Sequence, residues 1–202
     1  MKFIIVALLS YVIGSFSSAY VLGKVLKKQD IRAYGSGNAG ATNAVRVFGK
    51  KIGAMAFALD VLKGVLAVYI GNKILGYDGK LIAGFFAVIG HNWPVFFNFK
   101  GGKGIATSFG IWLSIHWPSA ILTLLVFIIM AITTKYISLA SISAAFAAPF
   151  VILIVKKPFD LKLLLVMLLL SILAIYKHRS NIKRLLEGKE YRVGEKVRKG
   201  DD

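Results

Sequence analysis

Residues 119–155, SAILTLLVFIIMAITTKYISLASISAAFAAPFVILIV, decide the fold class of this chain. They form two apolar runs, 119–134 and 137–155, which are separated only by Lys135 and Tyr136. Each run is close to the roughly 20 residues that an α-helix needs to cross the hydrocarbon core of a bilayer. The stretch therefore predicts two membrane helices joined by a tight polar turn.

The rest of the chain follows the same pattern. Of its 202 residues, 57% are hydrophobic, and the mean hydropathy of +0.71 is far above that of a soluble domain. We predict an all-α integral membrane protein that forms a single domain over residues 1–202. Seven transmembrane helices, several of them short, are expected from apolar runs near residues 3–23, 53–70, 81–99, 104–118, 119–134, 137–155 and 161–176.

The basic residues set the predicted orientation. With the N-terminus outside, the segments on the inner side carry 19 of the 26 Lys and Arg residues, against six on the outer side. The positive-inside rule then places the C-terminus in the cytoplasm. The polar motif segments that face the cytoplasm in this arrangement are 24–51, 100–104 and 177–191.

The N-terminus also has features of a signal peptide, with Lys2, an apolar stretch and a small-residue site near Ala19. We favour an uncleaved first helix, because export would carry seven Lys and Arg residues to the wrong side. Ser10, Gly14 and Ser18 add a small-residue stripe suited to packing against another helix.

Composition excludes several classes of protein. The net charge of +17 lies in gaps between apolar runs, which argues against nucleic acid as a partner and favours lipid headgroups and anionic metabolites. There is no cysteine, and the three histidines are scattered, so we expect no metal site and no cofactor. No obligate protein partner is evident.

The first glycine-rich segment is 35–46, GSGNAGATNAVR. It matches G-x-G-x-x-G, but a dinucleotide fold needs a preceding strand and a βαβ unit, which a helical membrane chain lacks. A glycine turn before a short helix from about Ala41 still offers N–H groups to a phosphate, although a plain loop is the simpler alternative. Its candidate ligands are Ser36, Gly37, Asn38, Thr42, Asn43 and Arg46.

The second glycine-rich segment is 98–108, NFKGGKGIATS. Its glycines expose backbone N–H groups, its lysines add positive charge, and a helix that starts at Gly104 adds its dipole, so we expect a phosphate there. It is not a Walker A motif, because Gly104 stands where Ser or Thr should follow the lysine. A positive-inside turn is the alternative. The candidate residues are Gly101, Gly102, Lys103, Gly104 and Thr107.

Several other polar and aromatic residues have a structural and a functional interpretation. We favour a structural ion pair for Asp60 and Lys63, and a satisfied histidine near the glycine loop for His91. Ser141 either donates to an anion or bonds back to its own helix. For the three tryptophans we favour interfacial anchors, namely Trp93, Trp112 and Trp117.

The tail from Lys177 predicts a short interfacial helix with one apolar face, ended by Gly188 as a C-cap. This leaves three polar residues unexplained on the side of the glycine loops: His178, Asn181 and Glu190.

Segments 35–46, 91–107 and 181–190, with the hydropathy profile, resemble the bacterial acyl-phosphate:glycerol-3-phosphate acyltransferases, an integral membrane family of the PlsY type. The resemblance implies an inner-membrane enzyme with its active site facing the cytoplasm. Such an enzyme moves a fatty acyl group from acyl phosphate to the 1-hydroxyl of sn-glycerol 3-phosphate and makes lysophosphatidic acid. Its expected partners are glycerol 3-phosphate, acyl phosphate and membrane lipid.

The resemblance also assigns roles by position. The residues assigned to catalysis are Ser36, Arg46, Lys103, His178 and Glu190. The residues assigned to substrate binding are Gly37, Asn38, Thr42, Asn43, His91, Gly101, Gly102, Gly104, Thr107, Ser141, Asn181 and Gly188. Ala39 is a departure from the proline of many relatives, which loosens the first turn and removes no ligand.

The sequence lacks the His-x4-Asp pair of acyl-CoA acyltransferases. Acyl phosphate is a mixed anhydride, so direct attack without an acyl-enzyme suffices. Candidate bases are His178, Glu190 and a substrate phosphate oxygen, of which we favour the phosphate.

A carrier or channel for a phosphorylated metabolite is the alternative function, but the polar loops gather on one face and the chain shows no clear repeat. A membrane interaction protein would leave both glycine segments unexplained.

Overall fold

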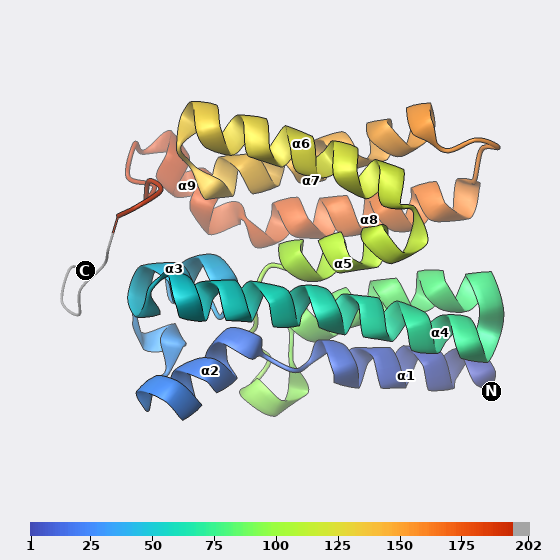
Figure 1. Cartoon of the computed structure of the whole chain (residues 1–202), viewed down its shortest axis with the longest axis horizontal. Helices are drawn as coiled ribbons and strands as arrows, with labels where there is room; N and C mark the ends of the chain where they lie inside the picture. The colour runs from blue at the N-terminus through green and yellow to red at the C-terminus, as the bar shows by residue number, and fades with distance from the viewer. Residues whose placement is uncertain (196–202) are drawn as a thin grey trace.

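The computed structural model describes residues 1–195, and all regular structure in that range is helical (Figure 1), which confirms the all-α prediction. The elements are α1 (Lys2–Gly14), α2 (Ser18–Lys27), η1 (Ile31–Ala33), α3 (Ala41–Phe48), α4 (Lys50–Asn92), η2 (Val95–Phe97), α5 (Ile105–Ile115), α6 (Trp117–Thr134), α7 (Ile137–Val155), α8 (Leu161–Lys177) and α9 (Arg179–Leu186).

The helices form two layers with α5 between them (Figure 1). One layer contains α1, α2, α3 and α4, and the other contains α6, α7 and α8. Helix α5 packs on α4 and continues into α6, so it joins the layers. Helices α3 and α9 lie at the same end of the molecule, opposite the N-terminus (Figure 1).

Helix α4 is a hairpin of two helical arms. Leu75 and Gly76 have non-helical backbone angles, and Gly76 has a φ of +59°. The arms touch backbone to backbone, because a Cβ on Gly71 would lie 2.3 Å from the carbonyl oxygen of Gly79. Glycine is thus required for space at Gly71 and Gly79, where the backbones of the two antiparallel arms are in direct contact.

Within residues 1–195, four helical stretches are long and apolar enough to cross a membrane, and one of them, Lys50–Phe97, contains both arms of α4. A fifth is present if α8 and α9, which meet at 53°, count as one span, and α5 is a shorter apolar helix. These stretches match the predicted apolar runs. The count of seven crossings and the orientation of the termini stay predictions.

The first predicted span, 3–23, lies within one apolar stretch, Lys2–Lys27, but this stretch is two helices because the chain breaks between Gly14 and Ser18. The break frees the carbonyl of Phe16, which accepts a hydrogen bond of 2.6 Å from Nζ of Lys63. The predicted small-residue packing is confirmed, since a Cβ on Gly14 would lie 2.1 Å from the carbonyl oxygen of Ala87.

The third predicted span, 81–99, is too long. Helix α4 ends at Asn92, and Pro94 precedes the single turn η2. Proline disfavours helical geometry for the residue before it, here Trp93. The remaining residues, from 93 to 104, form the loop that carries the second glycine-rich segment.

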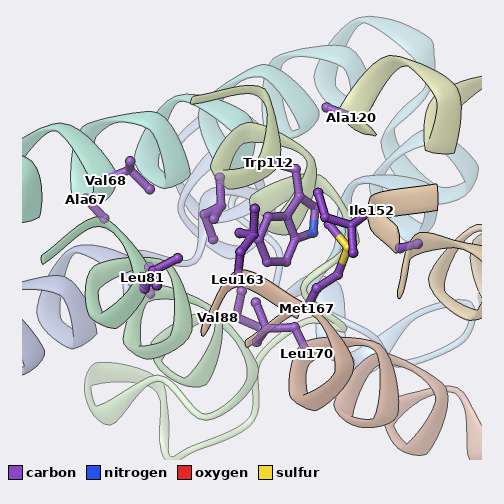
Figure 2. Packing of buried hydrophobic residues seen from close by; sticks show 13 residues of the cluster. Ala67, Val68, Leu81, Val88, Trp112, Ala120, Ile152, Leu163, Met167 and Leu170 are labelled. Carbon is purple, nitrogen blue, oxygen red and sulfur yellow. The ribbon is translucent and has the colours of Figure 1, made fainter. Parts of the chain in front are cut away.

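The main core lies where α4, α5, α7 and α8 meet, and Trp112 is at its centre (Figure 2). The Trp112 side chain is 6% exposed and packs among Ile152, Leu163, Met167 and Leu170. Its prediction as an interfacial anchor is therefore wrong, because α5 is covered by both layers. Many large apolar side chains on the outer faces are exposed, as expected for helices that face lipid.

Candidate functional site

A polar cavity of about 140 Å³ lies at the end of the molecule that holds α3 and α9. Both glycine-rich segments, α7 and the turn between α8 and α9 contribute to its wall. Eleven of the predicted site residues line it: Ser36, Asn38, Thr42, Asn43, Arg46, His91, Lys103, Gly104, Ser141, His178 and Asn181. Segments far apart in the sequence thus meet in one place.

Asn43 organises the first glycine-rich segment. Its side chain is fully enclosed: Oδ1 accepts a hydrogen bond from the Ser36 N–H (3.0 Å), and Nδ2 lies within 3.3 Å of the carbonyls of Ile31, Tyr34 and Asn38. One amide therefore ties together a turn that has little other regular structure. This geometry gives Asn43 a structural role and leaves its amide no free donor for a ligand.

Arg46 extends from α3, which begins at Ala41 as predicted. Its guanidinium carbon lies 4.7 Å from the centre of the Tyr191 ring. Burial lowers the pKa of Arg46, but a guanidinium remains charged in proteins. Tyr191 was not among the predicted residues, because nothing in its local sequence links it to α3.

Residues 100–104 of the second glycine-rich segment, the glycine-lysine loop, pack against His91. The N–H of Gly102 donates to the His91 carbonyl (3.1 Å). A Cβ on Gly101 would lie 2.0 Å from that carbonyl oxygen, and one on Gly102 would lie 2.1 Å from the ring atom Nε2. Gly104, with a φ of +83°, starts α5 as predicted. The loop therefore needs glycine for close approach of its backbone to His91.

Lys103 extends from this loop to the side-chain oxygen of Asn181 on α9. Burial, together with the nearby Arg184 charge, lowers the pKa of the Lys103 ammonium to about 8. At neutral pH the ammonium is still mostly protonated. It supplies a compact positive charge to the cavity.

A buried polar network reaches the wall of the cavity through Asp60 and His91. Nζ of Lys63 is 2.8 Å from Oδ1 of Asp60 and 2.8 Å from Nδ1 of His91, which confirms the predicted pair and adds a third member. The Ser18 hydroxyl donates to Asp60 (2.7 Å), and Thr107 lies 3.2 Å from His91. The network joins α2, both arms of α4 and α5, so it fixes the surface on which the glycine-lysine loop rests.

His178 lies in the turn between α8 and α9 and is buried against the cavity. Its Nδ1 is 2.7 Å from the Ala174 carbonyl, so Nδ1 carries the hydrogen and the neutral ring keeps an acceptor at Nε2. Burial, together with the charge of Lys103, lowers the pKa of His178 to about 4. The ring is thus a neutral hydrogen-bond acceptor near pH 7 and a weak base.

Glu190 does not line the cavity, but it contacts Asn181, which does. Its Oε1 accepts from Asn181 Nδ2 (2.9 Å), and its Oε2 accepts from Arg184 Nε (2.9 Å). The carboxylate therefore orients the amide that Lys103 contacts. Gly188 has a φ of +69° just after α9 and ends this helix, as the tail sequence predicted.

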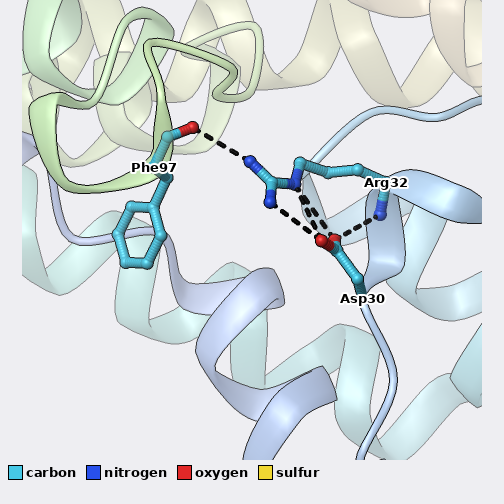
Figure 3. A network of polar contacts seen from close by, with 3 residues as sticks. All are labelled: Asp30, Arg32 and Phe97. Carbon is cyan, nitrogen blue, oxygen red and sulfur yellow. Dashed lines mark hydrogen bonds and ion pairs between the residues drawn. The ribbon is translucent and has the colours of Figure 1, made fainter.

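Arg32 joins the turn before the first glycine-rich segment to the turn before the second (Figure 3). It forms a two-point ion pair with Asp30, whose pKa it holds below the usual range, and its Nη1 donates to the Phe97 carbonyl (2.9 Å). Gly37 and Gly101 line an open hollow beside this clamp instead of the polar cavity. The clamp was not predicted, because Arg32 and Phe97 are distant in the sequence.

An apolar cavity of about 120 Å³ adjoins the polar one. The two share four lining residues: Phe57, Ile105, Phe127 and Ser141. From there the apolar cavity extends between α5, α6, α7 and α8 to Trp112 and Ala148. Ser141 donates to the Ile137 carbonyl (2.8 Å), which confirms the back-bonded alternative while leaving its oxygen at the border. The site is thus amphipathic and suits a molecule with a charged head and an apolar chain.

Comparison with known proteins agrees with this geometry. A family model described as glycerol-3-phosphate acyltransferase matches residues 4–188. The glycerol-3-phosphate acyltransferase of Thermoanaerobacter pseudethanolicus is 47% identical over 194 residues, which cover 96% of this chain and 97% of that protein. The one from Clostridioides difficile is 44% identical and covers the same shares.

Two crystal structures of PlsY (YgiH), an integral membrane glycerol 3-phosphate acyltransferase, are also similar. The glycerol 3-phosphate form has a TM-score of 0.89 and 38% identity, with 96% of each chain covered. The lysophosphatidic acid form has a TM-score of 0.86 and 37% identity, again with 96% of each chain covered. At this identity and coverage the fold is shared, and it is that of an integral membrane protein.

Proposed function

Because this chain belongs to the glycerol-3-phosphate acyltransferase family, we propose that it acylates the 1-hydroxyl of sn-glycerol 3-phosphate with acyl phosphate as the donor. The product is lysophosphatidic acid, made at the cytoplasmic face of the bacterial inner membrane. The observation that carries the proposal is the polar cavity that adjoins an apolar one and shares four wall residues with it. Such a site accepts a phosphate at one end and an acyl chain at the other.

The phosphate groups of both substrates bind at the cationic side of the polar cavity. Lys103 and Arg46 supply charge, and Ser36 supplies a hydroxyl. The N-terminus of α5 adds the N–H groups and the positive dipole end of a helix. The acyl chain lies in the apolar cavity toward Trp112.

The reaction needs no group on the protein to act as nucleophile. The substrate hydroxyl oxygen attacks the carbonyl carbon of acyl phosphate, the bond from that carbon to the bridging oxygen breaks, and inorganic phosphate leaves with the electron pair. His178 accepts a hydrogen bond from the hydroxyl and orients it. The proton passes to a phosphate oxygen, whose pKa near 6 suits the task better than the depressed pKa of His178. Lys103 stabilises the negative charge that develops.

Reconstitution tests this proposal. Purified protein in vesicles receives labelled glycerol 3-phosphate with acyl phosphate, with acyl-CoA, or with neither. We expect labelled lysophosphatidic acid only with acyl phosphate, and none from a Lys103→Ala variant that retains its melting temperature. Product with acyl-CoA alone would reject the donor, and label that crosses the vesicle without acylation would identify a carrier.

A further inference from the structure

We propose that Tyr191 is a positioning residue that holds the guanidinium of Arg46 ready for the substrate phosphate. Tyr191 follows α9 in the chain, whereas Arg46 lies on α3 and lines the polar cavity. The guanidinium carbon of Arg46 is 4.7 Å from the centre of the tyrosine ring. This inference rests on the proposed function only in naming the anion as glycerol 3-phosphate.

The Tyr191 ring contacts the Arg46 guanidinium without occupying the guanidinium N–H donors. Within residues 1–195, no hydrogen bond or ion pair engages the Arg46 side chain. A cation over an aromatic face is attracted by the ring quadrupole, while the five N–H groups of guanidinium lie in its own plane. An acidic partner would occupy those donors, but a ring leaves them free for two-point contact with a phosphate.

The same ring contacts two arginines that have different partners. The Arg184 guanidinium carbon lies 5.7 Å from the Tyr191 ring centre, and its Nε is paired with Glu190 (2.9 Å). Arg184 is thus engaged by a carboxylate, whereas Arg46 contacts the ring and has its donors available to the cavity. Glu190 and Tyr191 are consecutive, so one short segment orients Asn181 next to Lys103 and supports Arg46.

The segment that carries Tyr191 is anchored on both sides. Before it, Glu190 is buried and bonded to α9 through Asn181. After it, the Val193 N–H donates to the Lys135 carbonyl (2.8 Å), and Arg192 Nε donates to the Tyr136 hydroxyl (3.3 Å). The chain therefore runs from α9 to the turn between α6 and α7, and the ring is held at a fixed place against α3.

Substitution at position 191 separates the ring face from the hydroxyl. We expect Tyr191→Leu to weaken glycerol 3-phosphate binding and to raise its KM by about fivefold to thirtyfold, the range of a partly desolvated cation–π contact. The kcat and the KM for acyl phosphate should change by less than about twofold. Tyr191→Phe, which keeps the ring, should restore the wild-type KM.

The matched control is Tyr176→Leu. Its ring carries Arg179 at the same 4.7 Å, but Tyr176 is 54% exposed on α8 and lies outside both cavities. This variant should leave the KM unchanged. If Tyr191→Leu does not fold, Tyr191→Met replaces it, and melting temperatures identify which variants are folded.

A double-mutant cycle with Arg46→Ala decides whether Tyr191 acts through Arg46. We expect Tyr191→Leu to have little further effect on glycerol 3-phosphate affinity, measured by calorimetry, when Arg46 is already absent. An equal loss in both backgrounds, or a loss in Tyr191→Phe equal to that in Tyr191→Leu, would overturn the inference. An unchanged affinity in Tyr191→Leu would overturn it as well. Calorimetry measures binding without turnover. A wild-type protein that binds glycerol 3-phosphate but does not acylate it would therefore reject the proposed function. The binding data would still decide this inference.

Discussion

The two glycine-rich segments use glycine for different physical reasons. In segment 35–46, Gly37 has a φ of +68°, which side-chain-bearing residues rarely adopt, although a Cβ would have room there. Gly35 combines a φ of +58° with a Cβ that would lie 2.4 Å from Oδ1 of Asn43. In the glycine-lysine loop, Gly101 and Gly102 are needed because a Cβ would collide with His91. The first segment thus depends on backbone conformation and on one amide, Asn43, whereas the second depends on an already folded α4. Substitutions in the two segments are therefore expected to disrupt the site by different mechanisms.

Gly102→Ala should have the largest effect. The added Cβ would meet a histidine ring held by Lys63 and Thr107, which cannot move freely. Overpacking of about 3 kcal/mol would lower kcat/KM for glycerol 3-phosphate roughly 100-fold. Gly40→Ala is the control, since its Cβ meets only the Asn38 side-chain end, and it should cost less than about threefold. Equal losses in the two variants would show that space at His91 is not the cause.

Asn43 should be the next most sensitive position. Asn43→Leu leaves the Ser36 N–H and the Asn38 carbonyl without a partner, whereas the carbonyls of Ile31 and Tyr34 each keep a backbone donor. Each unpaired group costs about 1–3 kcal/mol when buried. We expect a lower melting temperature together with a loss of roughly 30-fold in kcat/KM. Asn43→Asp should be no better, because it places an acceptor opposite carbonyls. Lost activity with an unchanged melting temperature would instead indicate that Asn43 binds substrate.

The charge on Lys103 should be visible in the pH dependence. The buried ammonium, with a pKa of about 8, binds phosphate when protonated and loses that ability as the pH rises through 8. The kcat/KM for glycerol 3-phosphate should therefore fall about tenfold per pH unit above this value. Lys103→Arg keeps its charge, so the fall in kcat/KM should begin only above pH 10 in this variant. A limb near pH 8 that persists in Lys103→Arg would assign the titration to another group.

Gly37 should show the smallest effect. A Cβ there has room, since its nearest neighbour is the Arg32 carbonyl oxygen at 3.5 Å, so only the left-handed φ resists substitution. Gly37→Ala should cost about 1–2 kcal/mol of stability, whereas Gly37→Asn should cost less because asparagine tolerates this region. Melting temperatures test the order. A larger loss in Gly37→Asn would show that space, not conformation, limits this position too.

The sequence predicted features that depend on local pattern. The apolar runs became helices, α3 and α5 begin directly after Gly40 and Gly104 of the glycine-rich segments, and Ser10, Gly14 and Ser18 are buried. These outcomes follow from hydropathy, small side chains and helix-start signals, which are encoded within a few residues.

Features that depend on distant partners were missed. The break after Gly14 is stabilised by Lys63, the two glycine segments are joined by Arg32 and Phe97, and Tyr191 meets Arg46 only in the folded chain. Trp112 is buried because two layers cover α5, which local amphipathicity does not reveal. Sequence reasoning therefore identified most of the residues of the cavity but not the contacts that hold them in place.

The border between the two cavities has a kinetic consequence. Since Phe57 and Ser141 belong to both walls, a bound acyl chain can remain in an apolar medium while its head reaches the polar groups. Moving about ten methylenes into water would cost roughly 8 kcal/mol. Under the proposed function the soluble substrate travels to the lipid-borne one. The turnover should then follow the surface density of acyl phosphate in the bilayer, so that dilution with inert lipid slows the enzyme at a constant bulk concentration.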